Sequence, residues 1–114
     1  MARTPAPAVE ATRKARPGDI EIDRDGHRVF SRGREVELTR IEYRLLEVLL
    51  ERRGRVQTRR QLLQSAWDTN ARIETRTVDM HIARLRSKLG EPGSLIETVR
   101  GVGYRLQGMA DSRS

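Results

Sequence analysis

Cations recur at helical spacing in one short segment of the chain, "RTVDMHIARLRSKL", which covers residues 76–89. The segment carries four Arg or Lys residues, one histidine and a single acid. A guanidinium group donates several hydrogen bonds from a fixed planar fork, so it suits phosphates and the acceptor edges of bases. The chemistry that this segment predicts is recognition of an anionic partner.

The segment divides into faces when each residue is turned 100° from the last. One narrow stripe is apolar and should face the core: Val78, Ile82, Leu85 and Leu89. The opposite ridge holds Arg76, Met80, Ala83, Arg84 and Ser87. A helix of this width fits the major groove of B-DNA, where Arg84 would bond a guanine edge and Met80 a thymine methyl. The side chains expected to clamp phosphates are Arg76, Thr77, His81 and Arg86. The alternative is a solvated helix face.

Two helices should precede this one and position it. Thr39 with Glu42, and Thr58 with Gln61, have the spacing of capping boxes at helix starts. The first helix should end at Gly54, and the second should lead through Trp67 into a loop over residues 68–74. The third helix is expected over residues 75–89. Two helices joined by a short loop, the second one basic, resemble a helix-turn-helix.

Short strands are expected on both sides of the helices. Residues 18–38 alternate apolar and polar positions between turn signals, which predicts three or four antiparallel strands. Residues 95–106 read as a hairpin around Arg100, Gly101 and Gly103. An Arg at a hairpin tip suits a narrow minor groove. The two glycines would allow close approach to a phosphate backbone, or they serve ordinary turn chemistry.

Composition narrows the function classes. The chain has 114 residues, no cysteine, a net charge of +7 and a pI near 11.1. It therefore has one small core and no disulfide or thiolate metal site, which fits a cytoplasmic protein. No apolar run is long enough to cross a membrane and the start shows no secretory apolar region, so we expect neither a membrane span nor a secretory leader. The charge favours nucleic acid or an anionic membrane surface, against the alternative of a merely solvated basic surface. We expect no membrane partner, because the apolar side of the third helix is needed for the core.

Enzyme chemistry finds no support in the residues. His27 and His81 are far apart, and no nucleophile arrangement, metal-ligand spacing or phosphate-binding glycine loop appears. Glu42, Glu47 and Glu51 are interpreted as solvated or ion-pairing residues of the first helix. We therefore expect no catalytic residue, metal or cofactor.

Together, "WDTNARIETRTVDMHIARLRSKL", "IETVRGVGYRL" and the pattern "LT..E..LL..L" in the first helix resemble the OmpR/PhoB family of winged-helix response-regulator effector domains. The resemblance covers about residues 18–107. It implies an α+β winged helix-turn-helix with an N-terminal antiparallel four-stranded sheet, three helices and a C-terminal β-hairpin wing. Helix 75–89 would lie in the major groove and wing 95–106 at the minor groove.

The resemblance also implies roles for individual positions. Base contacts would come from Asp79, Met80, Arg84 and Arg100. Phosphate contacts would come from Trp67, Arg76, Thr77, His81, Arg86, Thr98 and Tyr104. The segment that would meet RNA polymerase is Asp68, Thr69, Asn70, Ala71, Arg72, Ile73 and Glu74. Ala83 stands where some members have an Arg, and Met80 where a smaller aliphatic residue is common, so base preference at Met80 cannot be copied.

The family resemblance further implies partners and a domain plan. The partners would be double-stranded DNA with promoter direct repeats, bound by head-to-tail dimers, and a receiver domain of a phosphorelay. Residues 1–17 are interpreted as a flexible tail or interdomain linker, and residues 108–114 as a disordered tail. A fragment of a longer regulator is favoured over a stand-alone regulator without a receiver. A winged helix that binds protein is the other alternative, but it should replace the cations of the third helix with apolar residues.

Overall fold

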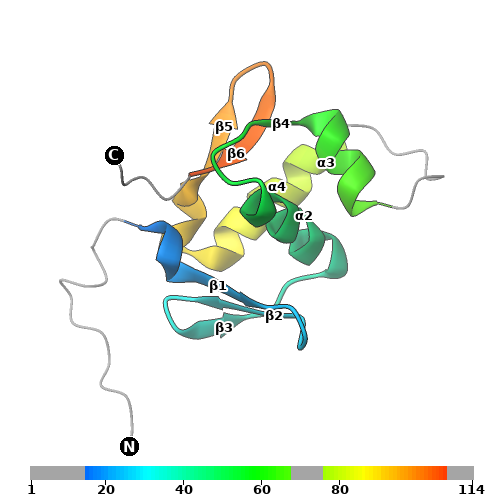
Figure 1. Ribbon diagram of the computed structural model, residues 1–114. Coiled ribbons are helices and arrows are strands. Elements are labelled where there is room, and N and C mark those ends of the chain that lie inside the picture. Colours follow the sequence, from blue (N-terminus) through cyan, green and yellow to red (C-terminus); the bar gives the residue numbers. More distant parts are fainter. Residues whose placement is uncertain (1–14, 68–75, 108–114) are drawn as a thin grey trace, which may run out of the picture.

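Three helices lie between two small antiparallel sheets in the computed structural model, which describes residues 15–67 and 76–107 (Figure 1). The N-terminal sheet contains β1 (Ile20–Asp23), β2 (Arg28–Ser31) and β3 (Arg34–Val36), preceded by the 3-10 turn η1 (Pro17–Asp19). The helices are α2 (Arg40–Glu51), α3 (Arg59–Ala66) and α4 (Arg76–Leu89). The second sheet contains β4 (Gln57–Thr58), β5 (Ile96–Val99) and β6 (Gly103–Leu106), and η2 (Glu91–Leu95) links α4 to it. The predicted α+β winged-helix class is confirmed.

The N-terminal sheet has three strands, in the order β1-β2-β3, within the residues that the structure describes. The four-stranded expectation is therefore wrong in this detail. After Val36 the chain runs as coil to Thr39, which already caps α2, so no residues remain for a fourth pairing. Ile20 and Val29 point to the core, while Glu21, Asp23 and Arg28 are exposed, as period-two alternation predicts.

Both predicted capping boxes are present. At α2 the Glu42 backbone N–H donates to Thr39 Oγ1 at 3.2 Å, and the Thr39 N–H donates to Glu42 Oε1 at 2.9 Å. At α3 the same two bonds join Thr58 and Gln61, at 3.0 and 2.8 Å. Each box satisfies two backbone donors that a helix start leaves without partners, which fixes where the helix begins. α2 ends at Glu51, three residues before the Gly54 expected to stop it.

The apolar stripe of α4 is the inner wall of the core, as predicted. Val78, Ile82 and Leu85 are fully buried, and Leu89 nearly so. They pack among residues of α2, α3, η2 and the second sheet, including Leu45, Leu49, Leu62, Leu95 and Leu106. Burying such side chains contributes about 1.5–3 kcal/mol each. This packing fixes the rotation of α4, and so decides which of its residues face outward.

The second sheet has the order β4-β6-β5, so the predicted hairpin β5–β6 gains a third strand that sequence reasoning missed. Gln57 pairs with Tyr104, and Thr58 with Gly103. A Cβ at Gly103 would collide with the Gln57 carbonyl oxygen, so this glycine is required by the approach of β4. Only Gly101, with φ at +76°, serves the turn in the way expected.

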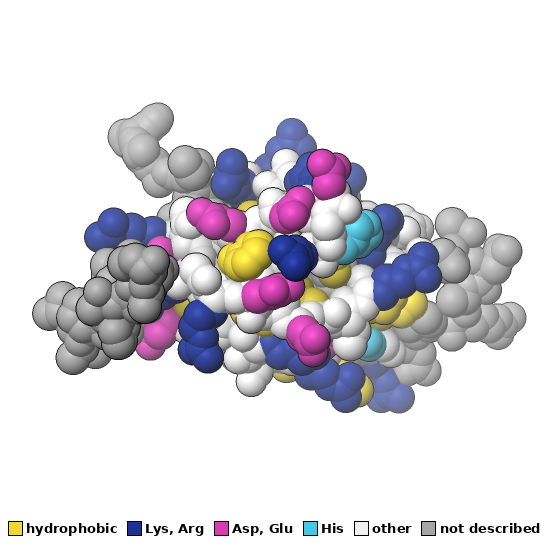
Figure 2. All heavy atoms as spheres, turned by 90° about the horizontal axis from the view of Figure 1, so that it is seen from below, with side chains coloured by type: hydrophobic (Ala, Val, Ile, Leu, Met, Phe, Trp, Pro, Cys, Tyr) yellow, Lys and Arg dark blue, Asp and Glu magenta, His cyan; other side chains and the backbone are white. Residues whose placement is uncertain are grey.

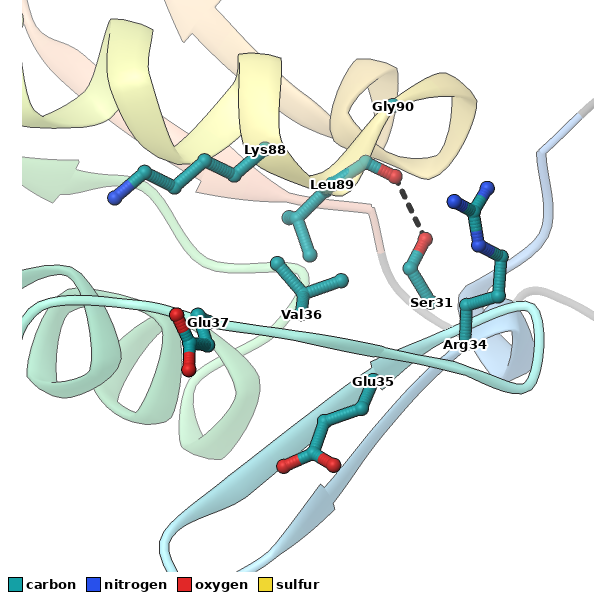
Figure 3. A pocket seen from close by; sticks show the side chains of 8 residues that line it. All are labelled: Ser31, Arg34, Glu35, Val36, Glu37, Lys88, Leu89 and Gly90. Carbon is teal, nitrogen blue, oxygen red and sulfur yellow. Dashed lines mark hydrogen bonds between the residues drawn. The ribbon is translucent and has the colours of Figure 1, made fainter.

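The C-terminal end of α4 rests on the N-terminal sheet (Figure 3). The Ser31 hydroxyl, on β2, donates to the Leu89 carbonyl at 2.6 Å. Leu89 and Lys88 line a pocket here with β3 residues Arg34 and Val36. The last turn of a helix leaves carbonyls without partners, and Ser31 satisfies one of them. In the part of the chain that the structure describes, no helix is long and apolar enough to cross a bilayer.

Candidate nucleic-acid interface

The outward ridge of α4 is exposed as its periodicity predicts. The exposed residues of this ridge are Arg76, Met80, Ala83, Arg84 and Ser87. Met80 is 54% exposed, whereas the apolar side chains of the inner stripe of the same helix are buried. A surface methionine flanked by arginines can contact both apolar and polar edges of a partner. We call this set of five residues the α4 ridge.

One shoulder of the ridge is organised by His81. Its Nδ1 lies 3.0 Å from the Thr77 carbonyl oxygen. A carbonyl oxygen can only accept, so Nδ1 carries the proton and donates. The Trp67 ring meets the His81 ring edge-on, with centroids 5.1 Å apart, and so holds the end of α3 against α4. The predicted phosphate contacts Trp67, Thr77 and His81 therefore lie together. With Nδ1 engaged, Nε2 is the remaining hydrogen-bonding atom of the His81 ring.

The other shoulder contains an intramolecular network around Asp79. Arg59 Nε, from the first turn of α3, donates to Asp79 Oδ1 at 2.8 Å. The Tyr104 hydroxyl, from β6, donates to the same oxygen in a short hydrogen bond. The Arg59 guanidinium also lies 5.4 Å from the centroid of the Tyr104 ring. Sequence reasoning missed Arg59, whose only signal was its place at the start of a capped basic helix.

These contacts set the charge states of the network. Burial raises the pKa of Asp79, but the hydrogen bonds from Tyr104 and Arg59 outweigh it and hold that pKa below its ordinary value. The bond to Asp79 raises the pKa of Arg59. Burial, and then Asp79, raises the pKa of Tyr104. The network is therefore a carboxylate bonded to a guanidinium and a neutral phenol.

Arg86 joins α4 to β5, the first strand of the hairpin. Its Nε donates to the Ile96 carbonyl at 3.0 Å, and its Nη2 donates to Thr98 Oγ1 at 2.7 Å. Its guanidinium also lies 5.5 Å from the centroid of the Tyr104 ring. Arg86, Thr98 and Tyr104, all predicted to touch phosphates, are thus brought together at the seam between α4 and the hairpin.

The turn of the hairpin projects from this seam. Arg100 and Gly101 are exposed, and Val102 is 44% exposed. At the base of the hairpin, Glu97 Oε1 accepts from Arg105 Nη2 at 2.7 Å and Nε at 3.0 Å, so the strands are cross-linked by a forked pair. Arg100 therefore stands at the tip of a hairpin whose two strands are joined by side-chain hydrogen bonds as well as by backbone pairing.

Lys88 is exposed but lies outside the α4 ridge, because its ammonium reaches a buried carboxylate. Its Nζ donates at 2.7 Å to Glu42 Oε1, the buried oxygen that also completes the α2 capping box. Burial raises the pKa of Glu42, but the Lys88 and Thr39 hydrogen bonds outweigh it and lower that pKa overall. Glu42 is 1% exposed, so it is an ion-pairing residue and not a solvated one.

The predicted polymerase-contact segment, residues 68–74, lies outside the described residues. Residue 75, the first of the predicted third helix, also lies outside them. Among the described residues, no group of three or more His, Cys, Asp or Glu side chains is placed to hold a metal ion.

Charge is distributed unevenly over the domain. Residues 19–38, which form the N-terminal sheet, carry six acids and four cations. Residues 55–67 and 76–107 together carry three acids and nine cations. Seen from the N-terminal sheet, the surface mixes both signs, with acidic side chains near its centre (Figure 2). The positive excess thus belongs to α3, α4 and the hairpin, which carry the α4 ridge and Arg100.

The family described as "Transcriptional regulatory protein, C terminal" matches residues 33–106. The chain is 47% identical over 109 residues to "Phosphate regulon transcriptional regulatory protein PhoB" of Rhizobium meliloti (strain 1021), covering 94% of this chain and 48% of that protein. It is 44% identical over 104 residues to the protein of the same description from Pseudomonas aeruginosa, covering 82% of this chain and 45% of the relative. The chain therefore spans about half the length of these curated relatives.

Solved structures with the same fold include two bound to DNA. The "response regulator AdeR DNA binding domain in complex with an intercistronic region" is 36% identical with a TM-score of 0.71, covering 80% of this chain and 95% of that one. The Klebsiella pneumoniae "RstA DNA-binding domain in complex with RstA box" is 30% identical with a TM-score of 0.68, covering 79% and 92%. "Response Regulator DrrB, a Thermotoga maritima OmpR/PhoB Homolog" is 35% identical with a TM-score of 0.71, covering 81% and 43%. This chain belongs to the OmpR/PhoB family of winged-helix DNA-binding effector domains that regulate transcription.

Proposed function

We propose that this domain binds double-stranded DNA sequence-specifically, with α4 in the major groove and the β5–β6 hairpin, its wing, at the adjacent minor groove. One observation carries the proposal: packing consumes the apolar stripe of α4 and leaves Arg76, Met80 and Arg84 exposed on its outer side. A helix that bound protein through this face would need apolar residues there. An arginine and methionine ridge instead matches the acceptors and methyl groups of base edges.

The proposed contacts fall into two classes. Arg84 and Met80 on the α4 ridge, with Arg100 on the wing tip, would meet bases. Arg76, Thr77, His81 and Trp67 would meet phosphates, positioning the helix without specifying sequence. Arg86 and Thr98 would present their remaining hydrogen-bonding capacity to a phosphate from the seam. The polar groups of Asp79 and Tyr104, predicted to contact a base and a phosphate, already bond each other in this structure.

Selection from a random DNA pool tests this function directly. We expect enrichment of one short motif whose best position contains a guanine, since Arg84 suits its O6 and N7 acceptors. A repeated half-site about one helical turn apart would support paired binding along one face of the duplex. A pool that stays random after several rounds would refute sequence-specific binding. Selective capture of single-stranded RNA instead would point to a different winged-helix role.

The larger setting is also a proposal. The chain spans about half of its curated relatives, which favours a domain of a longer two-component regulator with a receiver, over a stand-alone regulator. Head-to-tail pairs on promoter direct repeats, and contact between residues 68–74 and RNA polymerase, would complete that role. Work on chromosomal DNA would place the protein in the cytoplasm.

A further inference from the structure

Three segments far apart in the sequence meet at one carboxylate oxygen. Arg59 on α3 and Tyr104 on β6 lie 20 and 25 residues from Asp79, and both donate to its Oδ1. Asp79 itself stands on α4, beside Met80 on the α4 ridge. This oxygen therefore joins the second helix, the helix proposed to read DNA, and the wing.

The engaged groups have little left to offer a base. A phenol has one O–H donor, and that of Tyr104 is given to Asp79. An ionised carboxylate accepts only, and Oδ1 of Asp79 already accepts two hydrogen bonds. A bare carboxylate would also repel the phosphates of a duplex, whereas the Arg59 guanidinium at 2.8 Å compensates its charge. The arrangement therefore suits Asp79 to holding the interface elements in place better than to recognising a base.

The same contacts fix the wing relative to α4 on both of its strands. Tyr104 ties β6 to Asp79, and Arg86 ties β5 through the Ile96 carbonyl and the Thr98 hydroxyl. Tyr104 is 5% exposed, with its ring near two guanidiniums, so its position is set by packing as well. A wing held in this way need not be ordered when DNA binds, and preorganisation of that kind strengthens binding.

We propose that Asp79 is a positioning residue, which locks α3, α4 and the wing into one unit so that helix and wing engage adjacent grooves together. This rests on the proposed function and sharpens it, because Asp79 then acts through Tyr104 and Arg59 and does not read a base. Its contribution to binding should therefore depend on the wing.

The test compares variants in the 114-residue chain on the duplex enriched from the random pool. Asp79→Ala and Tyr104→Phe each remove the bond between α4 and β6, and each should weaken binding by about three- to tenfold. The double variant should lose no more than Asp79→Ala alone, because that change already removes the Tyr104 bond together with the Arg59 bond. Losses that multiply would overturn the proposal, as would relaxed preference at one base pair in Asp79→Ala alone.

A second pair of substitutions separates positioning from general weakening. Arg100→Ala should cost clearly less in the Asp79→Ala background than in the unmodified chain, because an unlocked wing contributes less. Arg84→Ala, the matched control on α4, should cost the same in both backgrounds. An equal cost of Arg100→Ala in the two backgrounds would overturn the proposal.

Amide hydrogen exchange without DNA keeps the proposal testable if the selection fails. Asp79→Ala and Tyr104→Phe should both speed exchange in β5 and β6 while leaving the α2 core amides unchanged. Unchanged exchange in the wing would overturn the locking role. If the selection enriched no motif but amide exchange in β5 and β6 were faster in both variants, the proposed function would be refuted and the locking role of Asp79 would still be supported.

Discussion

At the scale of single residues, neighbouring arginines of one helix have separate tasks. Arg84 is exposed on the α4 ridge, whereas Arg86, two residues later, donates to the Ile96 carbonyl and the Thr98 hydroxyl. Lys88 reaches inward to Glu42. Two residues turn a helix by about 200°, which places Arg86 on another face than Arg84, whereas Lys88 is drawn away from the α4 ridge by its bond to Glu42. Counting cations along α4 therefore overstates how many can meet DNA.

Arg84→Ala should weaken binding to the selected duplex by about 1–3 kcal/mol and relax preference at one base position. The reason is the loss of a forked donor at a guanine edge. Binding titrations against the selected duplex and each single-base variant measure both effects. Arg34→Ala, an equal charge change on the N-terminal sheet, is the control and should leave preference intact. Equal losses on selected and random DNA would make Arg84 a phosphate contact.

Arg76→Ala should lower affinity for all duplexes alike and reduce the slope of log affinity against log salt by about one unit. Arg76 stands at the start of α4, where a phosphate contact would release one condensed counterion. Titrations at several salt concentrations give the slope. A slope equal to that of the unmodified chain would remove Arg76 from the phosphate contacts.

At the scale of elements, local signals and distant pairings differ in how well sequence predicts them. The capping boxes at Thr39 and Thr58 span three residues each, so their spacing alone located the starts of α2 and α3. β4 has two residues and pairs with β6 more than forty positions later, which leaves no local periodicity to detect. Similarly, Lys88 and Glu42 stand 46 residues apart, and only the fold brings them together.

Gly103→Ala should destabilise the domain by about 1–3 kcal/mol, as overpacking does. The added methyl would meet the Gln57 carbonyl, so β4 must move away from β6. Thermal unfolding followed by circular dichroism measures the loss. Gly18→Ala, where a Cβ meets nothing within 4 Å, is the control and should change stability by less than about 0.5 kcal/mol. Matching stabilities for the two variants would contradict the close approach of β4.

At the scale of the whole molecule, ion pairs at the surface of the core connect helices and strands to one another. Glu42–Lys88 joins α2 to the end of α4, Asp79–Arg59 joins α4 to α3, and Glu97–Arg105 braces the wing. The outward position of the α4 ridge was predictable, because helical periodicity fixes which residues share a face. The partners of Asp79 and Arg86 were not, since they depend on how three elements meet.

Acid should destabilise the domain through these carboxylates. The pKa values of Glu42, Asp79 and Glu97 are all lowered by their hydrogen-bonded partners, against burial. A lowered folded-state pKa gives stability that is complete above the unfolded value of about 4 and is lost as pH falls through the folded value. Urea unfolding from pH 7 down to pH 2 should therefore show a steep loss at the acid end.

Glu42→Gln provides the matched variant for this pH dependence. Its amide can still accept from the Thr39 N–H, but it carries no charge for Lys88 and does not titrate. We expect lower stability at pH 7 and a shallower decline below about pH 4 than in the unmodified chain. Parallel curves for the two proteins would show that Glu42 has the same pKa folded and unfolded.

The wing separates positions fixed by packing from positions open to change. Gly103 has no space for a side chain and Tyr104 is buried, so the base of β6 tolerates little variation. Arg100, Gly101 and Val102 project from the turn, and a Cβ at Gly101 meets nothing within 4 Å. The tip is thus a replaceable module: under the proposed placement of the wing at the minor groove, new sequence preferences could be sought by varying residues 100 and 102 while the scaffold beneath stays intact.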